Sequence, residues 1–363
     1  MSQGKVVHVV TSLDFGGVEK HLETYAKFSH LSKWRPIFIA IGNGGRTQER
    51  IMKMGFEVFL LGLKPENPSI KSIIKLYGLL TKIRPDVVHT HGSEANFNGL
   101  IAAYLAGVPV RVAEEIGIPS HSKRAIVAFR LVYLLSSKVI AISDSVKSWL
   151  VSNGEVHASK VVKIYNPVED NSRIGSENSE RDNFDLTLSF VGRLEPVKNP
   201  LSLIRALPLL NFMGVSVRLY LVGDGSLKNE CNLLCSDLNI SNQVELVGYS
   251  SEPHSFIRKS DIYIQPSISE GFGIALVEAM LCGVPALASS VGGAPEIISH
   301  GENGWLIEDT NPDSLAKAIY AIWKDRESLS IFKKNAHESV FGRFAPSKYI
   351  VELDELYIQT QNN

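Results

Sequence analysis

Residues 262–280 read IYIQPSISEGFGIALVEAM, and they contain the pattern from which the rest of the fold follows. The short apolar run Ile262–Gln265 is typical of a buried strand, and the run that begins at Gly273 is typical of a helix. A strand, a glycine turn and a helix make up the βα unit of doubly wound parallel sheets. The first N–H groups of such a helix lack intrahelical partners, so the turn also predicts an anion-binding site.

Two carboxylates flank this turn. Glu270 precedes it, and Glu278 lies eight positions later, inside the predicted helix. With an anion on the helix end, both carboxylates can accept hydrogen bonds from sugar or ribose hydroxyls, which suits a diphosphate flanked by hydroxyl groups. A competing interpretation makes them the acid and the nucleophile of a glycosidase. It is the weaker one, because a carboxylate inside a helix beside an anion-binding turn is better placed to hold hydroxyls.

The same alternation of short apolar strands and helical patterns occurs twice along the chain. Repeated βα units indicate a parallel sheet, and their restart indicates a second one. At 363 residues the chain is also long for a single core. The sequence therefore predicts an α/β protein with two Rossmann-like domains. The predicted strands are 6–10, 36–41, 57–61, 87–89, 110–113 and 138–142, then 186–191, 215–222, 244–247, 262–265 and 285–288, with helices at 18–29, 47–54 and 70–83.

A change of composition separates the two domains. Residues 171–185 are mostly Asn, Ser, Glu, Asp and Arg, which indicates a linker. We therefore place an N-terminal domain at 1–166, a linker at 167–186, a second domain at 187–342 and a C-terminal helix at 343–363. Ligands of open α/β sheets bind at the carboxyl ends of the strands, so the two parallel sheets are expected to face a central cleft.

Composition narrows the choice of partners and compartment. The 37 Lys and Arg balance 38 Asp and Glu, which gives no support for nucleic-acid binding. The three cysteines are typical of the buried thiols of a reducing compartment rather than of a disulfide framework. Residues 1–5 run straight into the first strand without a signal-peptide pattern. We expect a cytoplasmic location.

No stretch reaches the roughly 18 to 20 apolar residues of a membrane span. The closest run is 125–135, which contains Arg130 and is flanked by Lys123, Arg124 and Lys138. Basic residues beside an apolar helix can attract anionic headgroups, which would place the N-terminal domain peripherally on the inner face of the membrane. The favoured alternative is a helix packed within that domain.

Motifs along nearly the whole chain together resemble the GT-B glycosyltransferases, specifically the large retaining family 4, whose signature is Glu-x7-Glu in an EGFG context. The resemblance implies that the last helix packs back on the N-terminal domain. In order, the motifs are GGVE at 16–19, DVVHTHG at 86–92, GRL at 192–194 with Lys198, LVGDG at 221–225, the Glu270 to Glu278 element, GGAPE at 292–296 and GENG at 301–304.

The donor side of the predicted site combines cations with carboxylates. Arg193 and Lys198 follow a predicted strand, where a guanidinium fork and an ammonium can bind phosphate oxygens. Taken alone, they would be interpreted as two solvated surface cations. The resemblance assigns both to the donor diphosphate, Glu278 to the ribose hydroxyls, and Glu270 to the donor sugar and the reaction centre.

Glycines and one aromatic residue complete the donor side. Gly16 and Gly17 follow the first strand, where glycine permits close approach of the backbone to a phosphate or an acceptor, although a simple tight turn explains them as well. They do not match the G-x-G-x-x-G dinucleotide pattern. Tyr249 lies where relatives contact the base and could stack on it. The predicted donor-binding residues are thus Gly16, Gly17, Gly271, Phe272, Gly273, Glu278 and Tyr249.

The acceptor side rests on fewer residues. His89 and His91 lie on the same side of a strand and could be metal ligands. No further residues at zinc-site spacing accompany them, so an acceptor or structural role is favoured and no metal is expected. The resemblance implies an active-site histidine shortly after the Gly-Val-Pro-Val strand; here Glu115, or Glu114 under a shifted alignment, occupies that position. The acceptor-side candidates are His91 and Glu115, with His121 as a further one.

The predicted activity is transfer of a sugar from a nucleoside-diphosphate sugar, of the UDP or GDP type, to an acceptor hydroxyl with retention of configuration. By the resemblance, the acceptor is a polysaccharide or a lipid-linked glycan. No Asp-x-Asp motif occurs, so cations and a helix end are expected to stabilise the leaving phosphate without a metal or other cofactor. The alternatives are a sugar-nucleotide epimerase of the same architecture and a non-catalytic nucleotide-binding protein.

Overall fold

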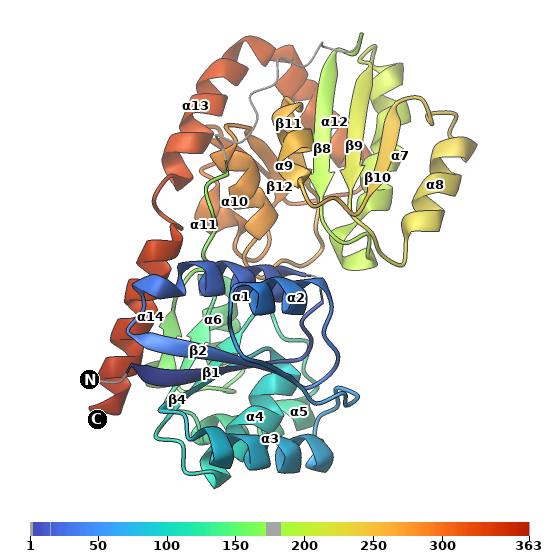
Figure 1. Ribbon diagram of the computed structural model, residues 1–363. Helices are drawn as coiled ribbons and strands as arrows, with labels where there is room; N and C mark the ends of the chain where they lie inside the picture. Colours follow the sequence, from blue (N-terminus) through green and yellow to red (C-terminus); the bar gives the residue numbers. More distant parts are fainter. Residues whose placement is uncertain (1–2, 15, 172–182, 363) are drawn as a thin grey trace. The chain divides into compact units, whose positions relative to one another are not determined.

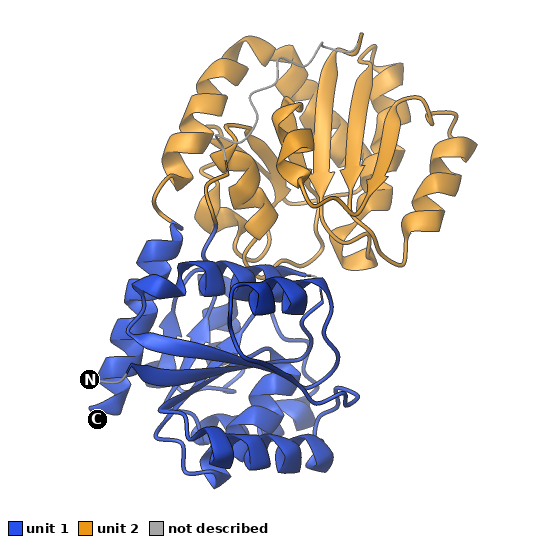
Figure 2. Ribbon diagram, in the orientation of Figure 1, with its two compact units in different colours: residues 1–168, 344–363 blue, residues 169–343 orange. Residues whose placement is uncertain are grey.

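The computed structural model describes residues 3–14, 16–171 and 183–362, and the chain divides into two compact units. Unit 1 comprises residues 1–168 and 344–363, and unit 2 comprises residues 169–343 (Figure 1, Figure 2). Residues 172–182, which fall within the predicted linker, lie outside the described residues.

Unit 1 is built on a seven-stranded parallel sheet, ordered β3-β2-β1-β4-β5-β6-β7. The strand order reverses between β1 and β4, which is the switch point where open α/β sheets bind ligands. The strands are β1 (Gly4–Val10), β2 (Trp34–Ala40), β3 (Val58–Leu60), β4 (Val87–His91), β5 (Val110–Glu115), β6 (Lys138–Ala141) and β7 (Val161–Lys163). The helices are α1 (Gly17–Phe28), α2 (Arg46–Lys53), α3 (Ile70–Ile83), α4 (Ser93–Leu105), α5 (Lys123–Leu134), α6 (Asp144–Ser152) and α14 (Pro346–Gln361), with 3-10 helices η1 (Ser29–Leu31) and η2 (Ala158–Lys160).

Helices cover both faces of this sheet (Figure 1). Successive residues of a strand point to opposite faces. In β1, Val7 and Val9 therefore enter the core beneath α3 and α4, whereas Val6 and Val10 enter the core beneath α1 and α14. His8 lies between the latter two valines in the sequence, so its side chain also faces α1 and α14.

The C-terminal helix α14 packs into the core of unit 1. Tyr349, Leu353 and Tyr357 recur every four residues, so they share one face of the helix, and all three are buried in the same core as β1. Asp354 accepts hydrogen bonds from the Ser32 hydroxyl (2.7 Å) and from the backbone N–H of Lys33 (2.8 Å). Apolar burial and this carboxylate therefore both hold α14 in place.

Unit 2 is built on a six-stranded parallel sheet, ordered β10-β9-β8-β11-β12-β13. A core of this unit lies between the sheet, α7 and α12, and is almost entirely aliphatic. The strands are β8 (Leu186–Val191), β9 (Val217–Val222), β10 (Val244–Gly248), β11 (Ile262–Gln265), β12 (Ala286–Ser289) and β13 (Gly304–Ile307). The helices are α7 (Pro200–Phe212), α8 (Lys228–Asp237), α9 (Pro253–Arg258), α10 (Ile274–Leu281), α11 (Ala294–Ile297), α12 (Pro312–Lys324) and α13 (Leu329–Val340), with η3 (Pro196–Lys198) and η4 (Arg326–Ser328).

The prediction of two Rossmann-like domains with parallel sheets is confirmed. The strands β7 and β13 were not predicted, and each adds an edge strand to its sheet. They are three and four residues long, and β13 begins with a glycine, which is uncommon in strands. Among the helices of the described part of the chain, none is long and apolar enough to cross a bilayer.

Candidate active site

Loops at the carboxyl ends of the strands in unit 2 pack on one another. The loop after β8 is joined to the loop after β9 by a hydrogen bond from the Leu194 N–H to the Asp224 carbonyl (2.9 Å). The loop after β12 approaches the loop after β11 at Gly292, where φ is +59° and an added Cβ would lie 1.6 Å from the Glu270 carbonyl oxygen. Only glycine permits this approach. These four loops therefore form one compact edge that can present side chains to a ligand.

Lys198 and Glu270 meet where the loops after β8 and β11 come together. Lys198 ends η3, and its Nζ donates a hydrogen bond to Glu270 Oε2 over 2.6 Å. The two side chains are 22% and 12% exposed, so solvent and ligands still reach them. An ammonium carries three N–H donors, and the two not used by Glu270 can bind phosphate oxygens.

Arg193 belongs to the same loop after β8, and its side chain is exposed. It forms no ion pair with any carboxylate of the described residues. Its guanidinium can therefore bind an anion without first giving up a carboxylate partner. Arg193 and Lys198 place two cations on one loop, and both kinds of side chain can bind phosphate oxygens.

Gly271, Phe272 and Gly273 lead into α10. Gly273 caps this helix in a left-handed conformation with φ near +106°, which favours glycine. Phe272 is fully buried, so a ligand at this turn meets its backbone rather than its ring. The free N–H groups at the start of α10 are the structural basis of the predicted anion site.

Glu278 lies within α10 and is nine-tenths buried. Its Oε1 is 3.5 Å from Nε2 of His254 on the neighbouring helix α9, and His254 is equally buried. The distance is too long for a strong hydrogen bond, so Glu278 keeps acceptor capacity for a hydroxyl group. Tyr249, in the loop that follows β10, has a side chain exposed enough to meet a ligand.

In unit 1, Gly16 and Gly17 form the start of α1. Gly16 adopts φ of +154°, and an added Cβ there would lie 2.5 Å from Glu19 Oε2. The Glu19 carboxylate also accepts a hydrogen bond from the Ser12 hydroxyl (2.9 Å). This helix end therefore already has a carboxylate beside it, and an anionic ligand here would be repelled by the charge of Glu19.

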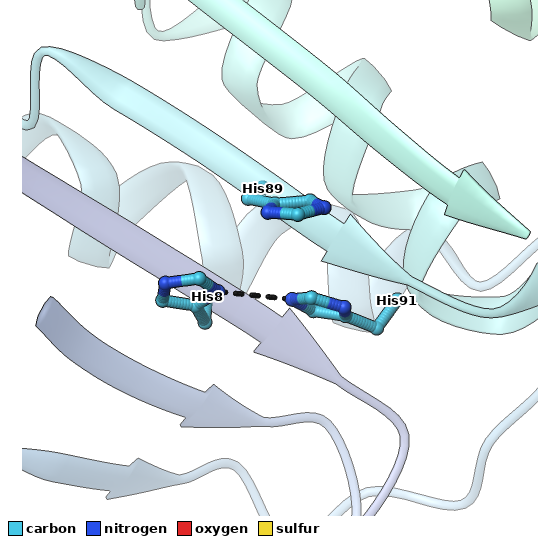
Figure 3. Close-up of side chains that lie close together, drawn as sticks. All are labelled: His8, His89 and His91. Carbon is cyan, nitrogen blue, oxygen red and sulfur yellow. Dashed lines mark hydrogen bonds between the residues drawn. The ribbon is translucent and has the colours of Figure 1, made fainter. Parts of the chain in front are cut away.

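His91 and Glu115 lie inside unit 1 rather than at its surface. His91 is buried against His8 and His89 (Figure 3) and also contacts Glu114. Neither His91 nor Glu115 is exposed to a ligand at the surface of the unit.

The Glu115 carboxylate accepts hydrogen bonds from the Tyr133 hydroxyl and from Asn96 Nδ2 (2.9 Å). Burial raises the pKa of Glu115 to about 7. Both partners of this carboxylate lie with it in the interior of unit 1.

His121 differs from the other acceptor-side candidates because it is partly exposed. It lies in the loop between β5 and α5, where its Nδ1 is 2.8 Å from Glu155 Oε1 and its ring stacks on Phe129 with centroids 4.1 Å apart. Burial lowers the pKa of His121, but the hydrogen bond and charge of Glu155 raise it more, so the net pKa lies above the usual value.

Sequence reasoning missed several residues that the fold brings to these groups. His254 carries no motif and reaches Glu278 only because α9 packs on α10. His8 and His21 meet His91 and Glu114 through contacts between elements far apart in the sequence. One signal was available for Glu114, because the resemblance left open which of two adjacent glutamates takes the position of the family histidine.

Comparison with known proteins supports the assignment of both units. Residues 15–172 match glycosyltransferase family 4, and residues 174–339 match the glycosyl transferases group 1 family. The UDP-Gal:alpha-D-GlcNAc-diphosphoundecaprenol alpha-1,3-galactosyltransferase of Escherichia coli is 31% identical over 311 residues, covering 80% of this chain and 79% of that protein. An N-acetylgalactosaminyltransferase of Campylobacter jejuni that acts on a diphospho-undecaprenol-linked sugar is 28% identical, covering 77% and 80%.

Solved structures match the fold over the full length. Anabaena Alr3699/HepE in complex with UDP aligns with a TM-score of 0.82 and 23% identity, covering 98% of this chain and 100% of that chain. A glycosyltransferase from Rickettsia africae aligns with a TM-score of 0.84 and 19% identity over both whole chains.

The two parallel α/β units, with glycine loops and a cation pair at one sheet edge, define a glycosyltransferase of the GT-B class. The similarity to relatives over four-fifths of the chain then fixes the family. The chain belongs to glycosyltransferase family 4. The predicted family and enzyme class are thereby confirmed.

Proposed function

We propose that this glycosyltransferase moves a sugar from a UDP-sugar to a hydroxyl of a lipid-linked glycan, with retention of configuration and without a metal or other cofactor at the donor site. The observation that carries the proposal is the Lys198–Glu270 pair at 2.6 Å, partly exposed on the loop that also carries Arg193. The names of relatives support the donor and the acceptor class, since one uses UDP-Gal and two act on diphospho-undecaprenol sugars.

The proposed transfer step relies on positive charge beside the leaving diphosphate. The bond between the anomeric carbon and the β-phosphate oxygen breaks, and the acceptor oxygen bonds to the same face of that carbon. The acceptor proton passes to the departing phosphate, so no strong protein base is required. Arg193, Lys198 and the start of α10 stabilise the negative charge that builds up on the diphosphate.

The carboxylates then bind the neutral parts of the donor. Glu278, buried in α10 with one distant imidazole neighbour, accepts hydrogen bonds from the ribose hydroxyls. Glu270 orients the Lys198 ammonium and lies beside the donor sugar. Tyr249 provides a ring on which the uracil can stack.

A lipid-linked acceptor requires contact with a membrane surface. In α5, the side chains of Val127, Leu131 and Leu134 are 54%, 61% and 66% exposed, and the helix contains no acidic residue. Lys123 and Arg124 begin the helix. Exposed apolar side chains beside cations suit the headgroup region of an anionic leaflet, so we place α5 against the inner face of the cytoplasmic membrane.

The first experiment measures the thermal midpoint of the purified protein with UDP, GDP, ADP and their sugars. A ligand that binds only the folded state raises the midpoint. We expect a shift with UDP and UDP-sugars that disappears in Arg193→Ala. Arg205→Ala is the matched control, because Arg205 is an exposed arginine on α7 of the same unit. No shift with any nucleotide would contradict the proposal.

Product analysis separates the rival functions. A transferase consumes UDP-sugar only when an acceptor is present, apart from slow hydrolysis. A sugar-nucleotide epimerase converts the donor with no acceptor at all, and a non-catalytic binding protein gives a UDP shift but no turnover with any lipid-linked acceptor.

A further inference from the structure

A pocket of about 530 Å³ lies in unit 1 between α5, the end of α6 and the short helix η2. Sites for small ligands typically measure about 300 to 1,000 Å³, so this pocket is large enough to hold one. The chemistry proposed for unit 2 uses none of its residues. The lining includes Arg130 and Leu134 of α5, and Glu155, Val156, His157 and Lys160 of the segment that follows α6.

Arg130 offers free donors to this pocket. Its side chain is exposed, and its Nε donates a hydrogen bond to the Gly154 carbonyl. Its two terminal amino groups form no hydrogen bond with another described residue, so they can bind two phosphate oxygens. Gly154 has φ of +63°, and an added Cβ would lie 2.8 Å from Arg130 Nη2. Glycine at this position therefore leaves room for the guanidinium.

Lys160 has a different role, because its ammonium is already used within the protein. Its Nζ donates to three backbone carbonyls at the end of α5, those of Tyr133 (3.1 Å), Leu134 (3.0 Å) and Ser136 (2.7 Å). Carbonyls at the end of a helix carry a partial negative charge, which would repel an anion. Lys160 offsets that charge at the wall of the pocket.

The surroundings of the pocket carry an excess of positive charge. Burial lowers the pKa of the Lys160 ammonium, and the positive charges of Arg111 and Lys138 lower it further. Glu155 is the only acidic side chain among the described residues that line the pocket. It is 0% exposed, and its Oε1 lies 2.8 Å from His121 Nδ1. An anion in the pocket would therefore meet more positive than negative charge.

The pocket adjoins the exposed apolar face of α5. Positions 127, 130, 131 and 134 are spaced i, i+3, i+4 and i+7, so their side chains share one face of the helix. Val127, Leu131 and Leu134 are each more than half exposed, and Arg130 lies among them. Leu134 also lines the pocket. An anion bound to Arg130 would thus have exposed apolar side chains beside it.

We propose that this pocket binds the phosphate of an anionic phospholipid headgroup, with Arg130 as its main contact and with Leu131 and Leu134 beside the acyl chains of the leaflet. The inference rests on the proposed placement of α5 against the membrane, to which it adds a headgroup site of defined residues. A lipid fits better than a free phosphate, because a small hydrophilic anion would leave the apolar side chains around Arg130 in water.

Co-sedimentation of the full chain with phosphatidylcholine vesicles, with and without phosphatidylglycerol, tests the site. We expect stronger binding when phosphatidylglycerol is present. Arg124→Gln is the matched control, because it removes the same charge from the same helix outside the pocket. It should weaken binding about fivefold, the effect of one surface charge near an anionic leaflet. Arg130→Gln should lose about tenfold more, because it also breaks the phosphate contact.

Equal losses in the two variants would overturn the proposal, since they would mean that α5 senses only the surface charge of the membrane. Absence of binding to any vesicle would overturn both this site and the membrane placement of α5. Neither result affects the donor site, which the thermal shift with UDP tests separately.

A second measurement needs no variant, and so does not depend on whether Arg130→Gln folds. Short-chain dihexanoyl-phosphatidylglycerol should raise the thermal midpoint of the wild-type protein, because it binds only the folded state. Dihexanoyl-phosphatidylcholine and inorganic phosphate at the same concentration should not. An equal shift with inorganic phosphate would overturn the lipid assignment in favour of a free anion, and no shift with the anionic lipid would overturn the site.

Discussion

The two units have the same architecture but keep their charged side chains in different places. In unit 1, Glu114 and the histidines around it are completely buried between the sheet and its helices. In unit 2, the corresponding core is aliphatic, and the Lys198–Glu270 pair lies at the carboxyl ends of the strands with 22% and 12% of its side chains exposed. One fold therefore places ionisable groups in two positions with different physical consequences.

The difference teaches how to distinguish a ligand site from a structural cluster. A charge at the strand ends can exchange its protein partner for a phosphate, because water and ligand both reach it. A charge inside the core must be compensated permanently, since leaving one member of a buried pair alone is strongly unfavourable. The motif histidines of unit 1 resemble site residues in the sequence, yet they lie in the core and not at its surface.

The largest expected effect is on the stability of unit 1. Glu114→Gln replaces the ionised carboxylate that the neutral imidazoles of His21 and His89 face, and loss of a polar contact to a buried charged group costs about 1.5 to 3 kcal/mol per contact. Urea unfolding measures the free energy. The control is Glu57→Gln, because the ion pair of Glu57 with Arg35 is about half exposed. This substitution should change the free energy of unfolding by less than about 1 kcal/mol. Equal effects of the two substitutions would remove the distinction between the units.

The next effect is on catalysis in unit 2. Lys198→Ala removes an ammonium from the leaving diphosphate, and loss of one such stabilising group typically lowers kcat by about 100- to 1000-fold. The unfolding free energy should change little, since the pair with Glu270 is partly exposed. Steady-state kinetics with UDP-sugar measures the effect. The control is Lys334→Ala, which removes an exposed lysine on α13. A near-normal rate would contradict the assignment of Lys198 to the donor phosphate.

The sequence predicted the parts of this comparison that depend on local pattern. The βα units, the glycine loops and the positions of Lys198 and Glu270 after strands all follow from residues near one another in the chain. The buried cluster does not, because its members meet only in the folded sheet: His21 and Tyr349, for example, are separated by 328 positions. The two-residue periodicity of a strand predicted that His89 and His91 share one face, but it gave no information on which elements cover that face.

A third prediction concerns the His121–Glu155 pair of unit 1, which is less buried than the Glu114 cluster. His121 is 12% exposed and contacts the buried Glu155, whose hydrogen bond and charge give His121 a raised pKa despite the opposing effect of burial. A raised folded-state pKa adds stability that is complete below the ordinary histidine pKa and is lost as pH rises through the folded-state pKa. His121→Gln should therefore cost about 1.5 kcal/mol near pH 6 and less at pH 8.5.

Unfolding of wild type and His121→Gln at both pH values measures this difference. A cost that increases with pH would show that His121 stabilises unit 1 in its neutral form, through its stacking on Phe129, and not through charge.

The smallest expected effect tests how far the buried carboxylate of Glu278, inside α10, depends on its neighbour His254. His254 Nε2 is 3.5 Å from Glu278 Oε1, so its interaction with that carboxylate is weak. His254→Ala should raise the Kd for UDP by only about two- to fivefold, the range that such ion pairs contribute. Isothermal titration calorimetry with UDP and with 2′-deoxy-UDP shows whether the loss of affinity involves the ribose 2′-hydroxyl. If His254 orients Glu278 toward the ribose, the substitution weakens the binding of UDP more than the binding of 2′-deoxy-UDP. Equal losses of affinity for the two ligands would mean that His254 supports only the packing of α9 on α10.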